Sequence, residues 1–156
     1  MRDIGEQFGE VAARDSLVHD HGCAPETIRV FHGSGVFDVV GETPDGRIVI
    51  IEAKGPNAEL GSRIDLDGNR SQQGTRPYAE SILDNMSKTA DPDDIDLVGR
   101  IQTQLELDDV RRDDPDFEPS VIYEEVKPKV EKRSEGGETT ESYGGYNRRN
   151  FDLRPR

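Results

Sequence analysis

The sequence predicts an α/β (α+β) domain in which helices flank a small mixed β-sheet. Three observations support this fold class. Apolar residues recur at helical spacing near the N-terminus and again after residue 75, and two strand-like segments enclose a tight-turn signal at residues 43–46. The length of 156 residues is that of one ordinary domain.

The first predicted element is a helix over residues 2–21, and it ends at Gly22, a residue type that favours helix C-termini. Its apolar stripe consists of Ile4, Phe8, Val11, Ala12 and Val18. A short strand is predicted at residues 28–32. It precedes the clearest strands of the chain, residues 36–42 and 47–53, which we expect to form an antiparallel hairpin.

The second half of the chain predicts fewer strands. Residues 55–70 are polar and rich in glycine, so we expect a loop, and an amphipathic helix follows at residues 75–87. A third helix is predicted over residues 95–110, with Leu97, Val98, Ile101 and Leu105 facing inward. A strand at residues 121–126 completes the sheet.

The domain is therefore expected to span residues 1–126. Residues 127–156 are predicted to be a mobile tail, because residues 128–148 contain little apolar side chain to offset the entropy of ordering. The end of the tail, residues 151–153, is either a short edge strand or unstructured.

The composition excludes several classes of protein. No apolar run approaches the length of a membrane span, residues 1–5 lack a signal-peptide core, and the single cysteine excludes an internal disulfide. The net charge is −13, with 33 acids and 20 bases. Such a chain can bind nucleic acid only through a local basic patch. Arg outnumbers Lys by 15 to 5, a bias that suits a salt-rich cytoplasm, although an ordinary acidic protein remains the alternative.

The residues that carry chemistry lie on the predicted hairpin. Its turn is centred near residue 45, so Asp38 and Glu52 are expected opposite each other on adjacent strands. Two facing carboxylates can share one hard cation, and Lys54, two residues after Glu52, points to the same face of the sheet. This combination suits metal-assisted phosphodiester hydrolysis, with Lys54 orienting water or stabilising developing charge.

The alternative for these three residues is an ordinary charged surface. Two features favour the catalytic interpretation. Glu52 ends the apolar run at residues 48–51, where an unpaired acid is costly, and Gly33-Ser34-Gly35 leaves the approach to the hairpin open.

In this context Asp38 and Glu52-Ala53-Lys54 resemble the PD-(D/E)XK nuclease superfamily, which has the restriction-endonuclease-like fold. Three local segments resemble more narrowly the C-terminal nuclease domains of polymorphic and contact-dependent toxins. They are residues 5–12, the two hairpin strands, and Gln72-Gln73-Gly74-Thr75 with Tyr78. The departure from the family pattern is Val36-Phe37-Asp38, which lacks the proline of the superfamily's name.

The resemblance implies roles for further residues. A glutamate of the first helix would supply a metal contact, and Glu10 is favoured over Glu6 because it flanks the apolar stripe more closely. Gln73 would position a phosphate or the attacking water. The predicted substrate-binding residues are Arg63, Arg70, Gln72, Thr75, Arg76 and Tyr78. Their alternatives are ordinary ones: a helix N-cap for Thr75, a core residue for Tyr78, and surface charge for the arginines.

The function expected from the sequence is a nuclease toxin domain that depends on Mg²⁺ or Mn²⁺. The resemblance implies a nucleic acid substrate, DNA or RNA (tRNA among them), action in the cytoplasm of a target cell, and a cognate immunity protein as partner. Two alternatives stay open, namely a non-catalytic interaction module that keeps the fold and a housekeeping DNA-repair nuclease.

Overall fold

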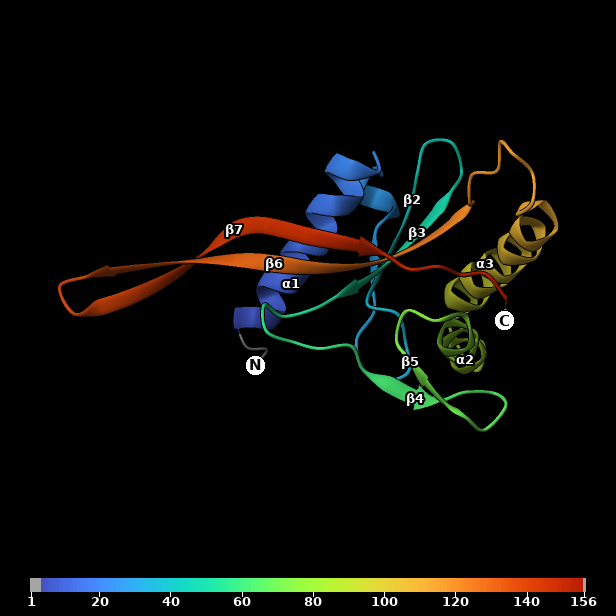
Figure 1. Cartoon of the computed structure of the whole chain (residues 1–156), viewed down its shortest axis with the longest axis horizontal. Coiled ribbons are helices and arrows are strands. Elements are labelled where there is room, and N and C mark those ends of the chain that lie inside the picture. The colour runs from blue at the N-terminus through green and yellow to red at the C-terminus, as the bar shows by residue number, and fades with distance from the viewer. Residues whose placement is uncertain (1–3, 156) are drawn as a thin grey trace.

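A five-stranded mixed sheet lies at the centre of the computed structural model, which describes the backbone of residues 4–155 and the side chains of residues 7–155. The strands lie in the order β1-β2-β3-β6-β7 (Figure 1). Only β3 and β6 run parallel among the described strand pairs of this sheet. The bounds are β1 (Arg29–Val30), β2 (Val39–Glu42), β3 (Ile48–Ala53), β6 (Val121–Glu135) and β7 (Glu138–Asn150). The predicted α+β class with a mixed sheet is confirmed.

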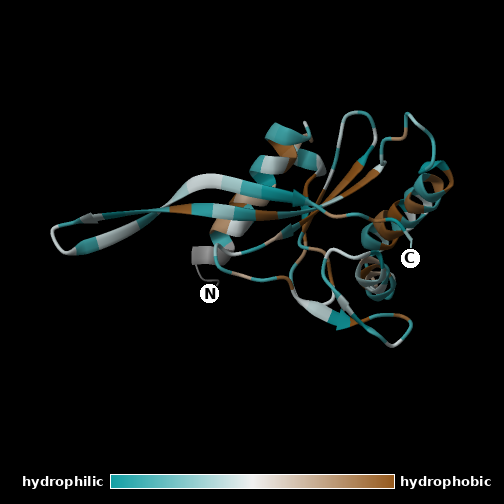
Figure 2. Ribbon diagram, viewed as in Figure 1, coloured by the Kyte–Doolittle hydropathy of each residue, from teal (hydrophilic) through white to brown (hydrophobic). Residues whose placement is uncertain are grey.

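Helices cover both faces of the sheet. Helix α1 (Ile4–Asp15) continues into a short π-helix (Ser16–Asp20) and packs on one face, where a core forms around Leu17, Val49 and Ile51. Helices α2 (Arg76–Met86) and α3 (Pro92–Arg111) pack on the other face, over a larger core. Figure 2 shows the hydrophobic residues gathered in the central strands and on the inner sides of these helices. A short 3₁₀ turn (Pro25–Thr27) links the π-helix to β1.

The predicted hairpin has the expected register. Val39 pairs with Ile51 and Gly41 with Val49, so positions that sum to 90 face each other. The turn closes where the sequence predicts it, with a hydrogen bond from Thr43 N to Arg47 O of 2.9 Å. Because side chains alternate along a strand, this register fixes which residues of β2 and β3 share a face.

The buried face of α1 differs from the predicted stripe. Gly9, Ala12, Ala13 and Leu17 are buried, whereas Val11 is 42% exposed. Small residues face the sheet because the helix approaches it closely. A Cβ on Gly9 would lie 2.9 Å from the backbone oxygen of Lys54.

The third helix begins earlier than predicted. Asp91 caps it by accepting from Asp93 N at 2.9 Å, and Pro92 occupies its first turn. Its four predicted inward residues are all buried: Leu97, Val98, Ile101 and Leu105. None of the described helices is long and apolar enough to cross a membrane.

The predicted loop at residues 55–70 contains a small second sheet. Its strands are β4 (Ser62–Ile64) and β5 (Arg70–Gln72), which pair antiparallel. Asp65 holds the turn between them, since its carboxylate accepts from Asn69 N at 3.0 Å and from the Ser71 hydroxyl. A polar hairpin of this kind has no apolar alternation, so the sequence pattern does not reveal it.

Most of residues 127–156, which the sequence predicts to be a mobile tail, form strands in the structure. Strand β6 continues to Glu135, and β7 returns from Glu138 after a Gly136-Gly137 turn in which both residues have positive φ. Residues 131–142 are exposed on both sides, but Tyr143 and Tyr146 pack against the α1 core. Residues 151–153 form no strand, although Leu153 is buried.

The close contact of α1 with β3 generates a stability prediction. The change Gly9→Ala should lower the free energy of unfolding by about 1–3 kcal/mol, because the new methyl group meets a backbone carbonyl that cannot move aside. The matched control is Gly99→Ala in α3, where the added Cβ meets nothing within 4 Å. That change should stabilise the protein by about 0.5–1 kcal/mol. Denaturant unfolding measures both values, and equal shifts would contradict the packing described here.

Candidate active site

Two acidic side chains meet on the α2–α3 face of the sheet. Asp38 directly precedes β2, and Glu52 is the penultimate residue of β3. The register of the hairpin places them opposite each other, on the same face as the buried Val40 and Ile50. Asp38 Oδ2 accepts a hydrogen bond from Ala53 N at 2.9 Å, which ties the start of β2 to the end of β3.

Glu52 is a buried acid with two hydrogen-bond donors. Its side chain is 1% exposed. Gln73 Nε2 donates to Oε2 at 2.8 Å, and the Tyr123 hydroxyl donates to Oε1 at 2.8 Å. Burial, followed by the charge of Asp38, raises the pKa of Glu52 to about 8. Burial also raises the pKa of Asp38, although contacts with Glu52 and the Ala53 N–H act against that rise.

Burial and the neighbouring carboxylate thus favour the protonated form of Glu52 when no cation is bound. A hydrogen bond between the Glu52 and Asp38 side chains raises the pKa of Glu52 and lowers that of Asp38. Two neighbouring carboxylates at a buried position repel each other unless a cation or a proton lies between them. Carboxylate oxygens such as these are the donors that hard divalent cations prefer.

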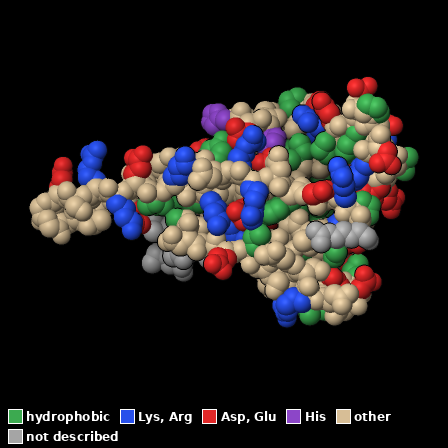
Figure 3. Space-filling view, in the orientation of Figure 1, with side chains coloured by type: hydrophobic (Ala, Val, Ile, Leu, Met, Phe, Trp, Pro, Cys, Tyr) green, Lys and Arg blue, Asp and Glu red, His purple; other side chains and the backbone are tan. Residues whose placement is uncertain are grey.

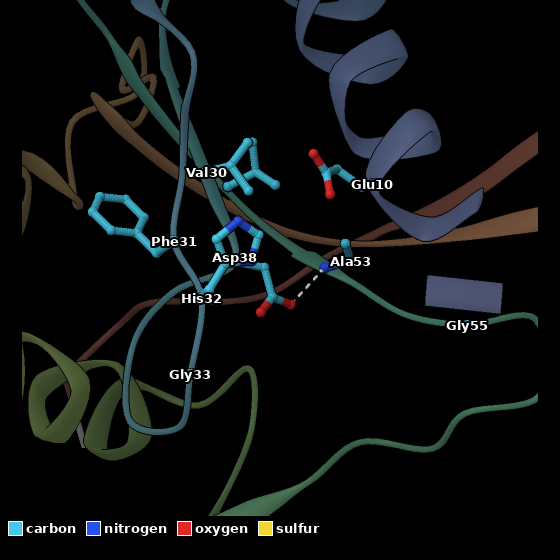
Figure 4. A pocket seen from close by; sticks show the side chains of 9 residues that line it. Glu10, Val30, Phe31, His32, Gly33, Asp38, Ala53 and Gly55 are labelled. Atoms are coloured by element: carbon cyan, nitrogen blue, oxygen red, sulfur yellow. Dashed lines mark hydrogen bonds between the residues drawn. The ribbon is translucent and has the colours of Figure 1, made fainter. Parts of the chain in front are cut away.

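Asp38 lies where two adjoining pockets meet. One pocket is lined by Glu10, His32 and Ala53 together with Asp38, and Figure 4 shows the Glu10 carboxylate pointing from α1 into this space. The second pocket is lined by Asp38, Glu52, Lys54, Arg63, Gln73 and Tyr78. Six predicted site residues from distant parts of the sequence therefore face one pocket.

Glu10 shares a pocket with Asp38 but does not complete a three-residue metal cluster. Among the described residues, no three His, Cys, Asp or Glu side chains are close enough to hold a metal ion together. Glu10 is 21% exposed and forms an ion pair with Arg14 at 3.5 Å. The side chain of Glu6, the alternative candidate, lies outside the described residues. The two carboxylates of Asp38 and Glu52 are suitable ligands for Mg²⁺ or Mn²⁺. Glu10 lines the same pocket as Asp38.

Two cations line the acidic pocket. The charge of Lys54 lowers the pKa of both Asp38 and Glu52 against the effect of burial, which reflects its position beside them. Arg63 Nη1 is buried and finds no hydrogen-bond acceptor among the described residues. A buried guanidinium nitrogen without an acceptor, at the wall of a pocket, is a ready site for an anionic oxygen of a ligand.

Gln73 is oriented by contacts on both ends of its amide. Its Nε2 donates to Glu52, and its Oε1 accepts from Gly61 N at 3.2 Å. The next residue, Gly74, has φ of +94°, and a Cβ there would lie 2.4 Å from the Phe151 ring. Glycine is required at this position, so the Gln-Gly step of the predicted motif turns the chain from Glu52 into α2.

Arg76, a predicted substrate-binding residue, is buried and lines neither of the two pockets. It is 7% exposed, and its guanidinium group binds Glu80 and Asp109 at 2.9 Å each and donates to Leu153 O at 2.7 Å. These contacts tie α2 to α3 and to the C-terminal segment. The guanidinium group of Arg76 is therefore engaged by contacts within the protein.

Of the other predicted substrate-binding residues, Arg70, Gln72 and Thr75 do not line the acidic pocket, whereas Tyr78 does. Arg70 is exposed and donates to Ser62 Oγ at 3.0 Å, outside both pockets, and Gln72 is exposed on β5. Thr75 is the N-cap of α2, and its side chain accepts from Tyr78 N. Tyr78 packs against the core and also lines the acidic pocket. Burial, with the charge of Glu52, raises the pKa of Tyr78 to about 12, so its hydroxyl stays protonated.

Sequence reasoning missed two residues of β6 that adjoin the site. Tyr123 donates to Glu52, and Glu125 is the register partner of Glu52 in the parallel β3–β6 pair. Glu125 is 6% exposed and binds Arg149 at 3.1 Å. The polar residues of the otherwise apolar run 121–126 were the available signal, but their partner strand cannot be read from the sequence.

Comparison with known proteins returns no match, whether with protein-family profiles, curated proteins or solved structures. What the pocket does is therefore inferred from its own geometry.

The pKa of Glu52 generates a prediction for the metal-free protein. Its pKa is about 8 in the folded state and near 4.5 in the unfolded state, so the folded state binds the extra proton. The contribution of Glu52 to the free energy of unfolding is fully present below pH 4.5, and it is lost as the pH rises through 8. The free energy of unfolding should fall over this window, by at most about 1.4 kcal/mol per pH unit.

Glu52→Gln should remove most of that dependence, because glutamine stays neutral. The control Glu106→Gln changes an exposed acid of α3 and should keep it. Urea unfolding with a chelator present, from pH 5 to pH 8.5, measures the slopes. A parent protein whose stability is constant or rises over this range would show that Glu52 is ionised in the fold.

Proposed function

We propose that this protein is a metal-dependent nuclease that hydrolyses phosphodiester bonds in DNA or RNA. The observation that carries the proposal is the buried Asp38–Glu52 pair, which retains a proton near neutral pH and opens onto a pocket with Lys54 and Arg63. Acids with perturbed pKa values in a cleft, beside a lysine and a buried arginine nitrogen that finds no acceptor among the described residues, are typical of a catalytic site.

Asp38 and Glu52 would hold Mg²⁺ or Mn²⁺ in place of the proton that they share, and Glu10 faces the same space from α1. The bound ion supplies Lewis-acid polarisation of the phosphodiester group and charge neutralisation. The hydrogen bonds from Gln73 and Tyr123 fix the Glu52 carboxylate in one orientation. A fixed carboxylate binds a cation without a further cost of ordering.

Lys54 and Arg63 act on the substrate. The ammonium group of Lys54 lies beside the acid pair and stabilises the negative charge that develops on the phosphoryl oxygens. The buried Arg63 nitrogen donates to a phosphate oxygen, which gives it the acceptor that none of the described residues provides. The pocket thus combines a cation site with two anion-binding groups.

The finer assignment rests on the sequence resemblance. The Asp38, Glu52-Ala53-Lys54 and Gln72-Gln73-Gly74-Thr75 segments support membership of the PD-(D/E)XK superfamily and a role as a toxin effector domain. Such a protein acts on nucleic acid in the cytoplasm of a target cell and has a cognate immunity protein. That Gln73 contacts Glu52, 21 residues away in sequence, favours treating these segments as one functional unit.

The direct test is incubation of the purified protein with plasmid DNA and with total RNA, each with Mg²⁺ and with a chelator. Cleavage that requires the metal supports the proposal and identifies the substrate. Calorimetric titration with Mg²⁺ distinguishes it from a non-catalytic interaction module, which has no need to bind the ion. Absence of both cleavage and metal binding would overturn the proposal.

Lys54 should be essential for cleavage but not for folding. Lys54→Ala should lower the cleavage rate by about 100-fold or more, since it removes a charge that acts on the transition state. Lys88→Ala is the control, because Lys88 is exposed and pairs only with Asp84 at 3.1 Å among the described residues. Thermal unfolding of both variants should match the parent. A folded Lys54→Ala protein that cleaves at the parent rate would exclude Lys54 from catalysis.

Arg63 and Arg70 are predicted to differ, although they lie in paired strands of one small sheet. Arg63→Gln should weaken substrate binding by about 10- to 100-fold, the effect of one charge-assisted hydrogen bond. Arg70→Gln removes the same charge outside the pocket and should change binding little. Steady-state cleavage kinetics with each variant give the comparison, and equal effects would remove Arg63 from the site.

A further inference from the structure

The β6–β7 hairpin leaves the sheet at the end where the acidic pocket lies. Strand β6 pairs with β3 as far as Val126, and Lys54 N donates to Val126 O at 3.0 Å. Beyond this point, β6 pairs with β7 alone among the described strands and continues to Glu135. Figure 1 shows the two strands projecting far from the rest of the protein. The base of the projection therefore adjoins Lys54.

The two faces of the hairpin differ. Tyr143 and Tyr146 cover the α1 core with one face. On the other face, Arg149 binds Glu125 at 3.1 Å and lies 5.4 Å from the centre of the Phe151 ring. Lys127 also approaches Glu125, at 4.0 Å. Phe151 packs against Tyr123, whose hydroxyl reaches Glu52, so this second face is continuous with the site.

Four basic residues share this site-side face. Lys127 and Arg149 belong to it by their contacts with Glu125. Lys129 and Arg133 follow at alternate positions of β6, whose even-numbered residues turn toward α1. We call Lys127, Lys129, Arg133 and Arg149 the basic row.

The basic row contrasts with the charge of the whole chain. The protein carries −13, whereas residues 127–156 contain eight bases and five acids. Lys129 and Arg133 form no ion pair with any described residue, and Glu131 is the acid that lies between them. Glu135 and Glu138 mark the acidic tip, where the row ends. Figure 3 shows Lys and Arg side chains along the hairpin and Asp and Glu side chains gathered around α3.

We propose that the basic row binds the sugar–phosphate backbone of a long polynucleotide whose scissile phosphate lies in the acidic pocket. This inference rests on the proposed function and names its substrate class. From Val126 to Arg133 the strand advances seven residues, a length of about 23 Å. That distance spans about seven base pairs of duplex at 3.4 Å per step. A duplex substrate would therefore have to extend at least that length beyond the cleaved bond to contact the whole row.

Two triple variants with equal loss of charge test the row. The row variant is K127Q/K129Q/R133Q. The control variant is K88Q/R111Q/K132Q. Lys132 lies on the opposite face of the same hairpin, near Glu141 at 3.8 Å. The other two control residues are exposed, Lys88 in the turn after α2 and Arg111 at the end of α3. If the row variant fails to fold, Lys129→Gln against Lys132→Gln gives the same comparison with single changes.

Binding is measured by fluorescence anisotropy with a chelator present, so that no cleavage occurs. The probes are 30-bp duplexes of DNA and of RNA, and a four-nucleotide single strand. At 0.1 M salt the row variant should bind the duplexes about tenfold more weakly than the parent, with a salt dependence lower by about two to three counterions. The control variant should stay within about twofold of the parent, and the short probe should not distinguish the three proteins.

Equal affinities of the row and control variants for the duplexes would overturn the inference, as would a parent protein that binds the short strand as tightly as the long duplexes. Cleavage with Mg²⁺ is measured separately. A parent that binds duplexes through the row but cleaves none would overturn the proposed catalytic function alone, because binding is measured without metal.

Discussion

The burial of Glu52 beside Asp38 is the interaction on which the arrangement of the protein depends. A buried acid is stable only when its oxygens are hydrogen-bonded and its charge is neutralised. Gln73 comes from the segment before α2, and Tyr123 comes from β6, 71 residues away in sequence. The hydrogen bonds to this one side chain therefore join the β2–β3 hairpin, the start of α2 and β6. The requirement also explains why Gly74 is needed, since the chain must turn sharply after Gln73 to begin α2.

The same requirement links stability to function. In the absence of a cation, the pair keeps a proton that bulk solvent would remove, and the fold contributes the hydrogen bonds that hold both groups in place. A site that is preorganised in this way loses little entropy when a divalent ion replaces the proton. Helix α1 approaches the same strand so closely that only glycine fits at position 9, and this contact places Glu10 at the wall of the pocket.

Sequence reasoning predicts well where a local rule decides the geometry. The turn at residues 43–46 sets the register of β2 and β3, and the register alone places Asp38 opposite Glu52. The sequence does not predict the position of a side chain when a partner that is distant in sequence determines it. Nothing near Arg76 in sequence indicates that Asp109 would bury it. The stripe of α1 was misjudged for the same reason, since the tight approach to β3 selects small residues over the larger Val11.

The hairpin after Val126 shows the limit of composition as a guide to order. Low apolar content predicts that a segment cannot form a core, and residues 131–142 indeed remain exposed. It does not predict the absence of strands, because β6 is already aligned by β3, and Gly136-Gly137 closes a two-residue turn that continues the pairing. A polar ribbon exposed on both sides adds little to the stability of the domain that carries it. Its length, its basic row and its position beside Lys54 are therefore best explained by contact with something outside the chain.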